Sequence, residues 1–174
     1  IIGFGNTGSK FASKLKSFDC KVIAYDPYVE INKLKFPHVI QSDLSEVLQK
    51  SEIISLHVPL NSETHMMVDD SFLSKCIQLN WLINTSRGKV VDTSALVRAM
   101  KNEQLAGAAL DVIEYEKHSF EGIPESKIPE DLRFLMSSDN CIITPHIAGW
   151  TYESNRKMAE ILSERILKVY EDKS

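Results

Sequence analysis

The stretch Ile1-Ile2-Gly3-Phe4-Gly5-Asn6-Thr7-Gly8 decides the fold of this chain. Its last six residues match G-x-G-x-x-G, after an apolar run and before the helical pattern of Gly8–Ser17, which is the context that the motif requires. The first glycine permits a tight turn, the second lets a pyrophosphate approach the backbone, and the third lets helix and strand pack closely. Amides at the N-terminus of the helix then bind the phosphates. The pattern predicts a dinucleotide site, although alone it also fits glycines that only form a turn.

An acidic residue, Asp26, completes this pattern at the end of Val22-Ile23-Ala24-Tyr25, 23 positions after Gly3. A carboxylate there accepts hydrogen bonds from the adenosine ribose hydroxyls and repels a 2′-phosphate. The sequence therefore favours NAD over NADP as the cofactor. The alternative is that Asp26 only shapes the turn before Pro27.

The rest of the chain alternates short apolar runs with amphipathic ones, which is typical of a parallel sheet covered by helices. We expect an α/β fold with a doubly wound parallel sheet (a Rossmann fold) in three layers, helices covering both faces. In such sheets ligands bind beyond the carboxyl ends of the strands. The expected strands are Ile1–Phe4, Lys21–Tyr25, Val39–Gln41, Ile53–Val58, Trp81–Asn84, Ala106–Asp111 and Cys141–Thr144, and the helices include Gly8–Ser17, Leu44–Lys50 and Ser94–Asn102.

Two segments interrupt this alternation. Glu114–Ser138 contains two prolines and many charges, and we expect a long excursion or lid. Thr151–Asp172 is expected to be one terminal helix, with apolar residues near helical spacing on one side: Met158, Ile161, Leu162, Ile166, Leu167 and Val169. The first strand begins at residue 1 without a lead-in, which suggests a fragment.

Composition narrows the class of protein. The 174 residues suit one domain, and the net charge of −4 includes no basic block for nucleic acid. Cys20, Cys76 and Cys141 lie far apart, which predicts neither disulfides nor a metal site and favours a reducing cytoplasm. No apolar run approaches the ~20 residues that span a bilayer, so we expect no membrane partner.

Three charged or titratable residues follow apolar strands. Arg87 follows Trp81-Leu82-Ile83, Asp111 ends the run from Ala106, and His146 follows the last strand. A planar guanidinium at the ligand edge can hold a carboxylate through two parallel hydrogen bonds. Taken alone, Arg87 would better fit a surface arginine in a turn.

With these residues the chain resembles the D-isomer-specific 2-hydroxyacid dehydrogenase family over nearly its whole length. The resemblance lies in the glycine loop, Tyr25-Asp26-Pro27, Leu56-His57-Val58-Pro59-Leu60 with Thr64, Asn84 to Gly88, Ala109-Leu110-Asp111-Val112 with Glu116, and Pro145-His146-Ile147.

The resemblance implies the roles of the site residues. Arg87 would bind the substrate carboxylate and polarise its keto group, His146 would be the acid/base, and Glu116 would pair with His146. An imidazolium paired with a carboxylate keeps a proton available near neutral pH. Asp111 would hold the nicotinamide end of NAD. The cofactor-binding residues would be Gly3, Gly5, Asn6, Thr7, Gly8, Asp26, Pro59, Thr64, Thr85, Ser86, Arg87, Asp111 and His146.

The sequence departs from the family in two ways. Lys117 stands where a proline commonly follows the position of Glu116, so Glu114 is the next candidate to pair with His146. Family enzymes also build a substrate domain from residues before the glycine loop and after the terminal helix. We therefore expect residues 1–174 to be a single dinucleotide-binding domain, inactive alone, from a parent homodimer acting on a small 2-keto or 2-hydroxy acid.

Several alternatives stay open. The chain could be an NAD-sensing interaction module of the corepressor type, or a hydrolase that uses bound NAD, although the Arg, Glu and His set argues against the hydrolase. Phosphoglycerate, glycerate, lactate and longer hydroxy acids are all possible substrates. Among the other histidines, His57 is expected to shape its loop, and His38, His65 and His118 are expected at the surface.

Overall fold

The structure, a computed structural model, describes residues 1–115 and 128–171. The strands are β1 (Val22–Ala24), β2 (Val39–Gln41), β3 (Ile53–Leu56), β4 (Trp81–Asn84), β5 (Gly107–Leu110) and β6 (Cys141–Ile143). The helices are α1 (Asn6–Leu15), α2 (Leu44–Lys50), α3 (Asp70–Ser74), α4 (Thr93–Lys101), α5 (Glu130–Ser137) and α6 (Tyr152–Glu171), with a 3-10 turn, η1, at Gly88–Val90.

All the strands are parallel, and the segment at Ile2 joins them into one sheet. β1 pairs with β2, and β3, β4, β5 and β6 pair in that order. Ile2 bridges Tyr25 on one side and Leu56 on the other, so the order is β2, β1, Ile2, β3, β4, β5, β6. The doubly wound parallel sheet expected from the sequence is confirmed.

The expected first strand, Ile1–Phe4, is shorter in the structure. Only Ile2 forms bridges, because the chain turns away at Gly3, which has a φ of 89°. Ile2 N donates to Ser55 O at 2.9 Å, and Gly3 N donates to Tyr25 O at 2.8 Å. The segment still lies at the centre of the sheet and delivers the glycine loop to its carboxyl edge.

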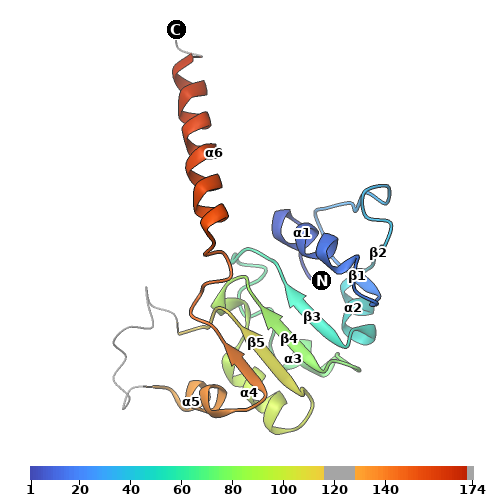
Figure 1. The fold of residues 1–174 in the computed structure, drawn as a ribbon. Helices are drawn as coiled ribbons and strands as arrows, with labels where there is room; N and C mark the ends of the chain where they lie inside the picture. The colour runs from blue at the N-terminus through green and yellow to red at the C-terminus, as the bar shows by residue number, and fades with distance from the viewer. Residues whose placement is uncertain (116–127, 172–174) are drawn as a thin grey trace.

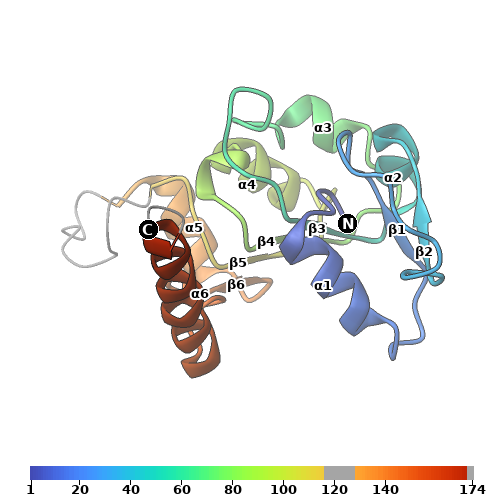
Figure 2. The ribbon, with the colours of Figure 1, turned by 90° about the horizontal axis from the view of Figure 1, so that it is seen from above.

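Alternate side chains of the strands pack into two cores, one on each face. Ile23 belongs to the larger core with the apolar residues of α2, α3, α4 and α5. Val22 and Ala24 pack on the other face with Ala12 of α1. Figure 2 shows α1 on the opposite side of the sheet from α2, α3 and α4. The three expected layers are present, but among the described residues α1 covers the second face beside β1 and β2 and at His57 after β3, while Ile142 on β6 is 58% exposed.

The expected excursion at Glu114–Ser138 is wrong in its last part. Residues Glu130–Ser137 form helix α5, whose Leu132 and Leu135 are buried in the larger core beside α4 and β6. The charged residues of this segment occupy the outer face of an amphipathic helix, so this part is a layer of the fold rather than a lid. Residues 116–127 lie outside the described part.

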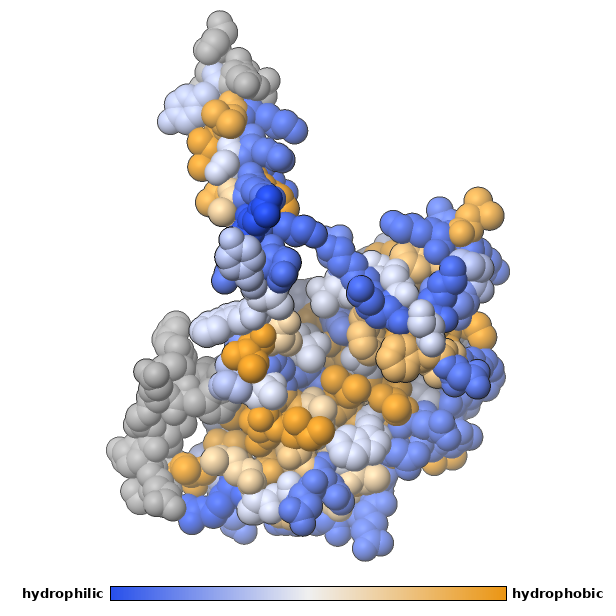
Figure 3. Space-filling model, in the orientation of Figure 1, coloured by the Kyte–Doolittle hydropathy of each residue, from blue (hydrophilic) through white to orange (hydrophobic). Residues whose placement is uncertain are grey.

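Helix α6 confirms the expected terminal helix and projects away from the sheet (Figure 1). Its apolar residues form exposed stripes in Figure 3, and Ile161, Leu162, Ile166 and Leu167 are 48 to 60% exposed. Among the described residues, no helix is both long and apolar enough to cross a bilayer.

Candidate functional site

The residues singled out in the sequence follow neighbouring strands at one edge of the sheet. Because all strands are parallel, their carboxyl ends meet at that edge. In the order of the strands, the edge carries Asp26 after β1, the glycine loop after Ile2, Pro59 after β3, Arg87 after β4, Asp111 after β5 and His146 after β6.

Two of the three glycines of the loop, Gly3 and Gly8, have steric reasons within the protein to be glycine. A Cβ on Gly3 would lie 2.5 Å from His57 O, and Gly3 also has a positive φ. A Cβ on Gly8 would lie 2.0 Å from Gly3 O, so helix α1 can begin beside the strand only without a side chain there. A Cβ on Gly5 meets nothing within 4 Å. The side-chain side of Gly5 therefore faces open space, so a pyrophosphate could approach the backbone closely there.

Helix α1 begins at Asn6, two residues earlier than expected, so Asn6 and Thr7 belong to its first turn. Its N-cap residue, Gly5, offers no side chain to cap the free N–H groups, and the first turn contains no acidic residue. The first N–H groups of a helix have no partner within the helix, and its dipole favours a negative charge at that end. This end of α1 suits a phosphate group.

Asp26 joins the glycine loop to the turn after β1. Its Oδ2 accepts from Phe4 N at 2.7 Å, and its Oδ1 accepts from Tyr28 N at 2.8 Å and Val29 N at 3.1 Å. The turn-shaping role considered as the alternative for Asp26 is therefore present. A carboxylate has about four acceptor positions, so a further hydrogen bond to a ribose hydroxyl is compatible with these three.

The loop after β3 is ordered by its own side chains. Thr64 is buried, and its hydroxyl donates to Pro59 O at 2.5 Å, while Asn61 Oδ1 accepts from Glu63 N and Thr64 N, both at 3.0 Å. Pro59 is exposed at the sheet edge. The buried Thr64 therefore contributes to the predicted cofactor site indirectly, by holding the loop that carries Pro59.

His57 lies beneath the glycine loop, in keeping with the expected role in shaping a loop. Its ring contacts Phe11 with a centroid distance of 5.1 Å, and its Nε2 lies 3.0 Å from Ser55 Oγ. Burial, together with the charge of the N-terminal amino group, lowers the pKa of His57 from 6.5 to about 4. His57 is therefore neutral near pH 7 and unsuited to proton transfer there.

The loop that carries Arg87 is organised by Asn84, a fully buried residue whose role was not predicted from the sequence. Asn84 Oδ1 accepts from Ser86 N at 3.0 Å and from Ser86 Oγ at 2.7 Å, and Asn84 Nδ2 donates to Arg87 O at 3.1 Å. Ser86 is buried, Thr85 is half-buried, and Arg87 is exposed. The sequence contains a signal for this role of Asn84, because polar residues that directly follow an apolar strand must form hydrogen bonds within the protein when they are buried.

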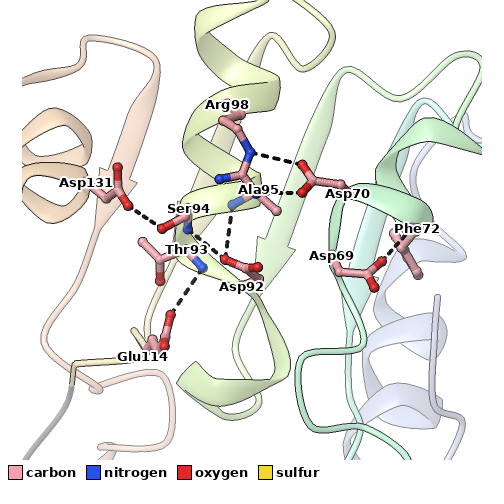
Figure 4. A network of polar contacts seen from close by, with 10 residues as sticks. All are labelled: Asp69, Asp70, Phe72, Asp92, Thr93, Ser94, Ala95, Arg98, Glu114 and Asp131. Atoms are coloured by element: carbon pink, nitrogen blue, oxygen red, sulfur yellow. Dashed lines mark hydrogen bonds and ion pairs between the residues drawn. The ribbon is translucent and has the colours of Figure 1, made fainter.

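The next residue fixes this loop against the segment after β5. A Cβ on Gly88 would lie 1.9 Å from Ile113 O, so the two backbones are in direct contact. Glu114 Oε2 accepts from Thr93 N at 3.2 Å at the start of α4 (Figure 4). Glu114, the fallback partner for His146, therefore contacts the N-terminus of α4. Glu116 lies outside the described residues.

Figure 4 shows that α4 also anchors α5 and α3. Asp92 caps α4 by accepting from Ser94 N at 2.9 Å and Ala95 N at 3.1 Å. Ser94 Oγ donates to Asp131 Oδ2 at 2.5 Å, and Arg98 pairs with Asp70 through two hydrogen bonds. The residues on both sides of segment 116–127 are thus tied to neighbouring positions on one helix.

Asp111 is buried and holds the turn that contains His146. Its Oδ1 accepts from Thr144 Oγ1 at 2.6 Å and Ile147 N at 2.9 Å, and its Oδ2 accepts from Ala148 N at 3.0 Å. Burial alone would raise the pKa of Asp111, but these three donors and the nearby His146 lower it below its ordinary value. Asp111 is therefore a carboxylate near neutral pH.

The remaining histidines differ partly from expectation. His65 is exposed, as expected. His38 is half-buried, and its Nε2 lies 2.8 Å from Ala12 O in α1, so placing it at the surface was wrong. The run around His38 is polar, but β2 packs that side chain against α1. His118 lies outside the described residues.

The register of the sheet sets the spacing of the chemical groups. Asn84, Leu110 and Ile143 are register partners on β4, β5 and β6, and Arg87 and His146 each follow their strand by three residues. Neighbouring strands lie about 4.8 Å apart, so the strands of Arg87 and His146 are separated by roughly 10 Å. Arg87 and His146 thus follow strands that are separated only by β5, at the same edge of the sheet.

Comparison with known proteins identifies relatives across this region. Residues 1–148 match the family model described as D-isomer specific 2-hydroxyacid dehydrogenase, NAD binding domain. The chain is 38% identical to a glyoxylate reductase of Thermofilum pendens over 170 residues, 97% of this chain and 47% of the relative. It is 39% identical to a D-specific alpha-keto acid dehydrogenase of Enterococcus faecium, over 92% of this chain and 48% of the relative.

Solved structures of dehydrogenases are also similar to this chain. The NAD complex of a D-isomer specific 2-hydroxyacid dehydrogenase from Lactobacillus delbrueckii ssp. bulgaricus superposes with a TM-score of 0.86 at 37% identity, covering 98% of this chain and 52% of that one. A D-lactate dehydrogenase with NAD+ from Lactobacillus jensenii gives a TM-score of 0.83 at 37% identity, over 92% and 48%. The chain spans about half the length of the relatives it matches.

Proposed function

The chain belongs to the D-isomer-specific 2-hydroxyacid dehydrogenase family, and we propose that it is the NAD-binding half of an enzyme that transfers a hydride between nicotinamide and a 2-keto acid. The observation that carries this proposal is the order of groups along the carboxyl edge. The glycine loop, with the uncapped start of α1, lies beside Asp26, and Arg87, Asp111 and His146 follow on the three last strands.

The cofactor fits the residues at this edge. Gly5 has open space on its side-chain side, the first turn of α1 has free amides for a pyrophosphate, and Asp26 has an acceptor position for the adenosine ribose. The strand order supports a placement with the adenosine end at β1 and the nicotinamide end at β4, β5 and β6. When bound, NADH supplies the hydride.

The chain's own residues supply binding and proton transfer. Arg87 binds the substrate carboxylate and polarises the keto oxygen, since its guanidinium offers several donors in one plane. His146 donates a proton to that oxygen during reduction and accepts it back during oxidation. Glu116 is proposed as the partner that keeps the imidazolium protonated, because Glu114 already contacts Thr93 N. Thr85, Ser86, Pro59 and Thr64 shape the walls of the cofactor site.

Asp26 supports a preference for NAD over NADP. The fold alone does not decide the coenzyme, because an acyclic imino acid reductase crystallised with NADPH and D-Arg superposes with a TM-score of 0.79 at 29% identity. A carboxylate at the adenosine ribose repels the 2′-phosphate of NADPH. NAD is therefore the proposed cofactor of this chain.

The proposed substrate is a small 2-keto or 2-hydroxy acid, and the named relatives act on glyoxylate, D-lactate and related acids. The test is NADH oxidation by the full-length protein with glyoxylate, pyruvate and bulkier 2-keto acids. Arg87→Lys should raise KM and lower kcat, because the lysine keeps the charge but loses the two-pronged geometry. Arg98→Lys, at a surface ion pair with Asp70, is the matched control and should behave as wild type.

His146→Ala should lower kcat by roughly 100- to 10,000-fold with little change in NADH affinity. Glu116→Gln should move the acid–base limb of the pH–rate profile to lower pH, because an imidazolium without a carboxylate partner gives up its proton more readily. Absence of NADH oxidation with every keto acid, despite NADH binding, would instead favour a sensing module.

We also propose properties of the parent enzyme, namely its dependence on a substrate domain, its location and its assembly. We expect residues 1–174 alone to have negligible turnover, because closure against a substrate domain normally excludes water and positions the substrate. The free thiols of Cys20, Cys76 and Cys141 support a reducing, cytoplasmic location. The exposed apolar side chains of α6 support packing against another part of a homodimeric parent enzyme.

A further inference from the structure

An exposed hydrogen bond joins the two loops on either side of the glycine loop. The hydroxyl of Tyr28, in the turn after β1, donates to Glu63 Oε2 at 2.5 Å, although the two residues are 35 positions apart in the sequence. Glu63 lies in the loop after β3, and β1 and β3 flank the segment at Ile2. The two side chains therefore meet at the carboxyl edge of the sheet, at the adenosine end of the proposed cofactor site.

The loops hold both ends of this hydrogen bond through their backbones. Tyr28 N donates to Asp26 Oδ1 at 2.8 Å, which ties Tyr28 to the residue proposed to bind the adenosine ribose. Glu63 N donates to Asn61 Oδ1 at 3.0 Å, within the loop that Thr64 also orders. Hydrogen bonds with an ionised acceptor are shorter and stronger than neutral ones. The Glu63 carboxylate is therefore directed toward the turn that carries Asp26.

Two carboxylates act on the hydroxyl of Tyr28. The hydrogen bond to Glu63 raises the pKa of this phenol above its ordinary value, and the charges of Glu63 and Asp26 raise it further. Both charges are negative, and both belong to residues at the edge where the ribose is proposed to bind. Charges of one sign in one place add in their effect on a third charge. A phosphate group on the ribose would therefore be repelled by both carboxylates.

We propose that Glu63 is a second determinant of coenzyme specificity, with Tyr28 as its positioning residue. This inference rests on the proposed function and adds to the role of Asp26. The two carboxylates differ in how they act. Asp26 accepts hydrogen bonds from the ribose hydroxyls, whereas Glu63 acts through its charge against the 2′-phosphate of NADPH. Glu63 therefore weakens NADPH binding and has little effect on NADH binding.

The test measures the dissociation constants of NADH and NADPH by calorimetry on the full-length protein. Glu63→Gln removes the charge but keeps the size of the side chain and an acceptor for Tyr28. It should strengthen NADPH binding by about two- to fivefold, the range of one interaction between exposed charges, with NADH affinity nearly unchanged. Tyr28→Phe, which frees Glu63 to turn away, should give a smaller change in the same direction. Glu52→Gln, an exposed glutamate directly before β3 at the opposite edge of the sheet, is the matched control and should keep the wild-type ratio of affinities.

A titration of the free protein tests the contact without a coenzyme. The Tyr28 phenol, followed by NMR, should titrate at a higher pH in the wild type than in Glu63→Gln, because the substitution removes a charge that opposes ionisation of the phenol. An unchanged ratio of NADPH to NADH affinity in Glu63→Gln would overturn the inference, and so would a Tyr28 titration that this substitution does not move. Absence of NADH binding by the wild type would contradict the proposed function itself and overturn this inference with it.

Discussion

Replacing Gly88 by alanine should separate the Arg87 loop from the segment after β5. The new Cβ would lie 1.9 Å from Ile113 O, 2.1 Å from Ile113 C and 2.7 Å from Glu114 N. Ordinary contacts between heavy atoms begin near 3.5 Å, so one backbone must retreat by about 1.6 Å. These atoms belong to the backbone, so no rotation of a flexible side chain can relieve the overlap. The stability cost should reach about 1–3 kcal/mol, the usual range for overpacking.

Catalytic activity should fall as well, because Arg87 is the residue next to Gly88 in the chain. A displacement of about 1 Å at a substrate-positioning group can reduce turnover by about 100-fold. The assay is urea unfolding and steady-state NADH oxidation of the full-length protein, with Gly149→Ala as the control for stability, since a Cβ there meets nothing within 4 Å. NADH affinity should be largely retained in Gly88→Ala. Wild-type stability together with wild-type kcat/KM in this variant would refute the argument.

Two further substitutions test the glycine loop and the histidine beneath it. Gly5→Ala should leave the fold intact, because its Cβ meets no protein atom within 4 Å. It should weaken NADH binding by about tenfold, or about 1.4 kcal/mol, because the new methyl group overlaps with the phosphates. Equal NADH affinity of the variant and the wild type in calorimetry would contradict this. The pKa of His57 is lowered from 6.5 to about 4 in the folded protein, so His57 binds a proton more readily in the unfolded chain. The free energy of unfolding should therefore fall as the pH drops from 6.5 to about 4. The decrease should be at most about 1.4 kcal/mol per pH unit, and smaller because solvent partly reaches the ring. His57→Asn should flatten this pH dependence in unfolding experiments, and an identical pH profile would argue against a buried neutral imidazole.

Much of the fold could be predicted from the sequence because apolar runs and glycine spacing report directly on a parallel sheet. β2, β4 and α2 have the expected bounds. Helix α3 was not predicted, since its five residues are too few to show a helical period, and Asp69 defines its start through a local cap on Phe72 N. Helix α5 was not predicted, because the segment before it contains two prolines and the helix itself carries several charges, and its formation depends on the tertiary burial of Leu132 and Leu135.

The candidate site could be placed at the sheet edge but not built from the sequence. Strand ends identify Arg87, Asp111 and His146, because the carboxyl edge follows from the topology. The pattern does not show which groups hold them, since Asn84 and Thr144 act through hydrogen bonds across loops and neighbouring strands. The close contact of Gly88 with Ile113 likewise exists only after β4 and β5 have paired.

The most direct test of the account is calorimetric titration of residues 1–174 with NADH and with NADPH, in the wild type and in Asp26→Ala. We expect one NADH per chain, with NADPH weaker by about tenfold or more, because the carboxylate at the adenosine ribose repels the 2′-phosphate. Asp26→Ala should narrow this difference by weakening NADH and easing NADPH. Absence of saturable NADH binding by the folded wild-type chain would contradict the central claim, and equal or tighter binding of NADPH would contradict the role of Asp26.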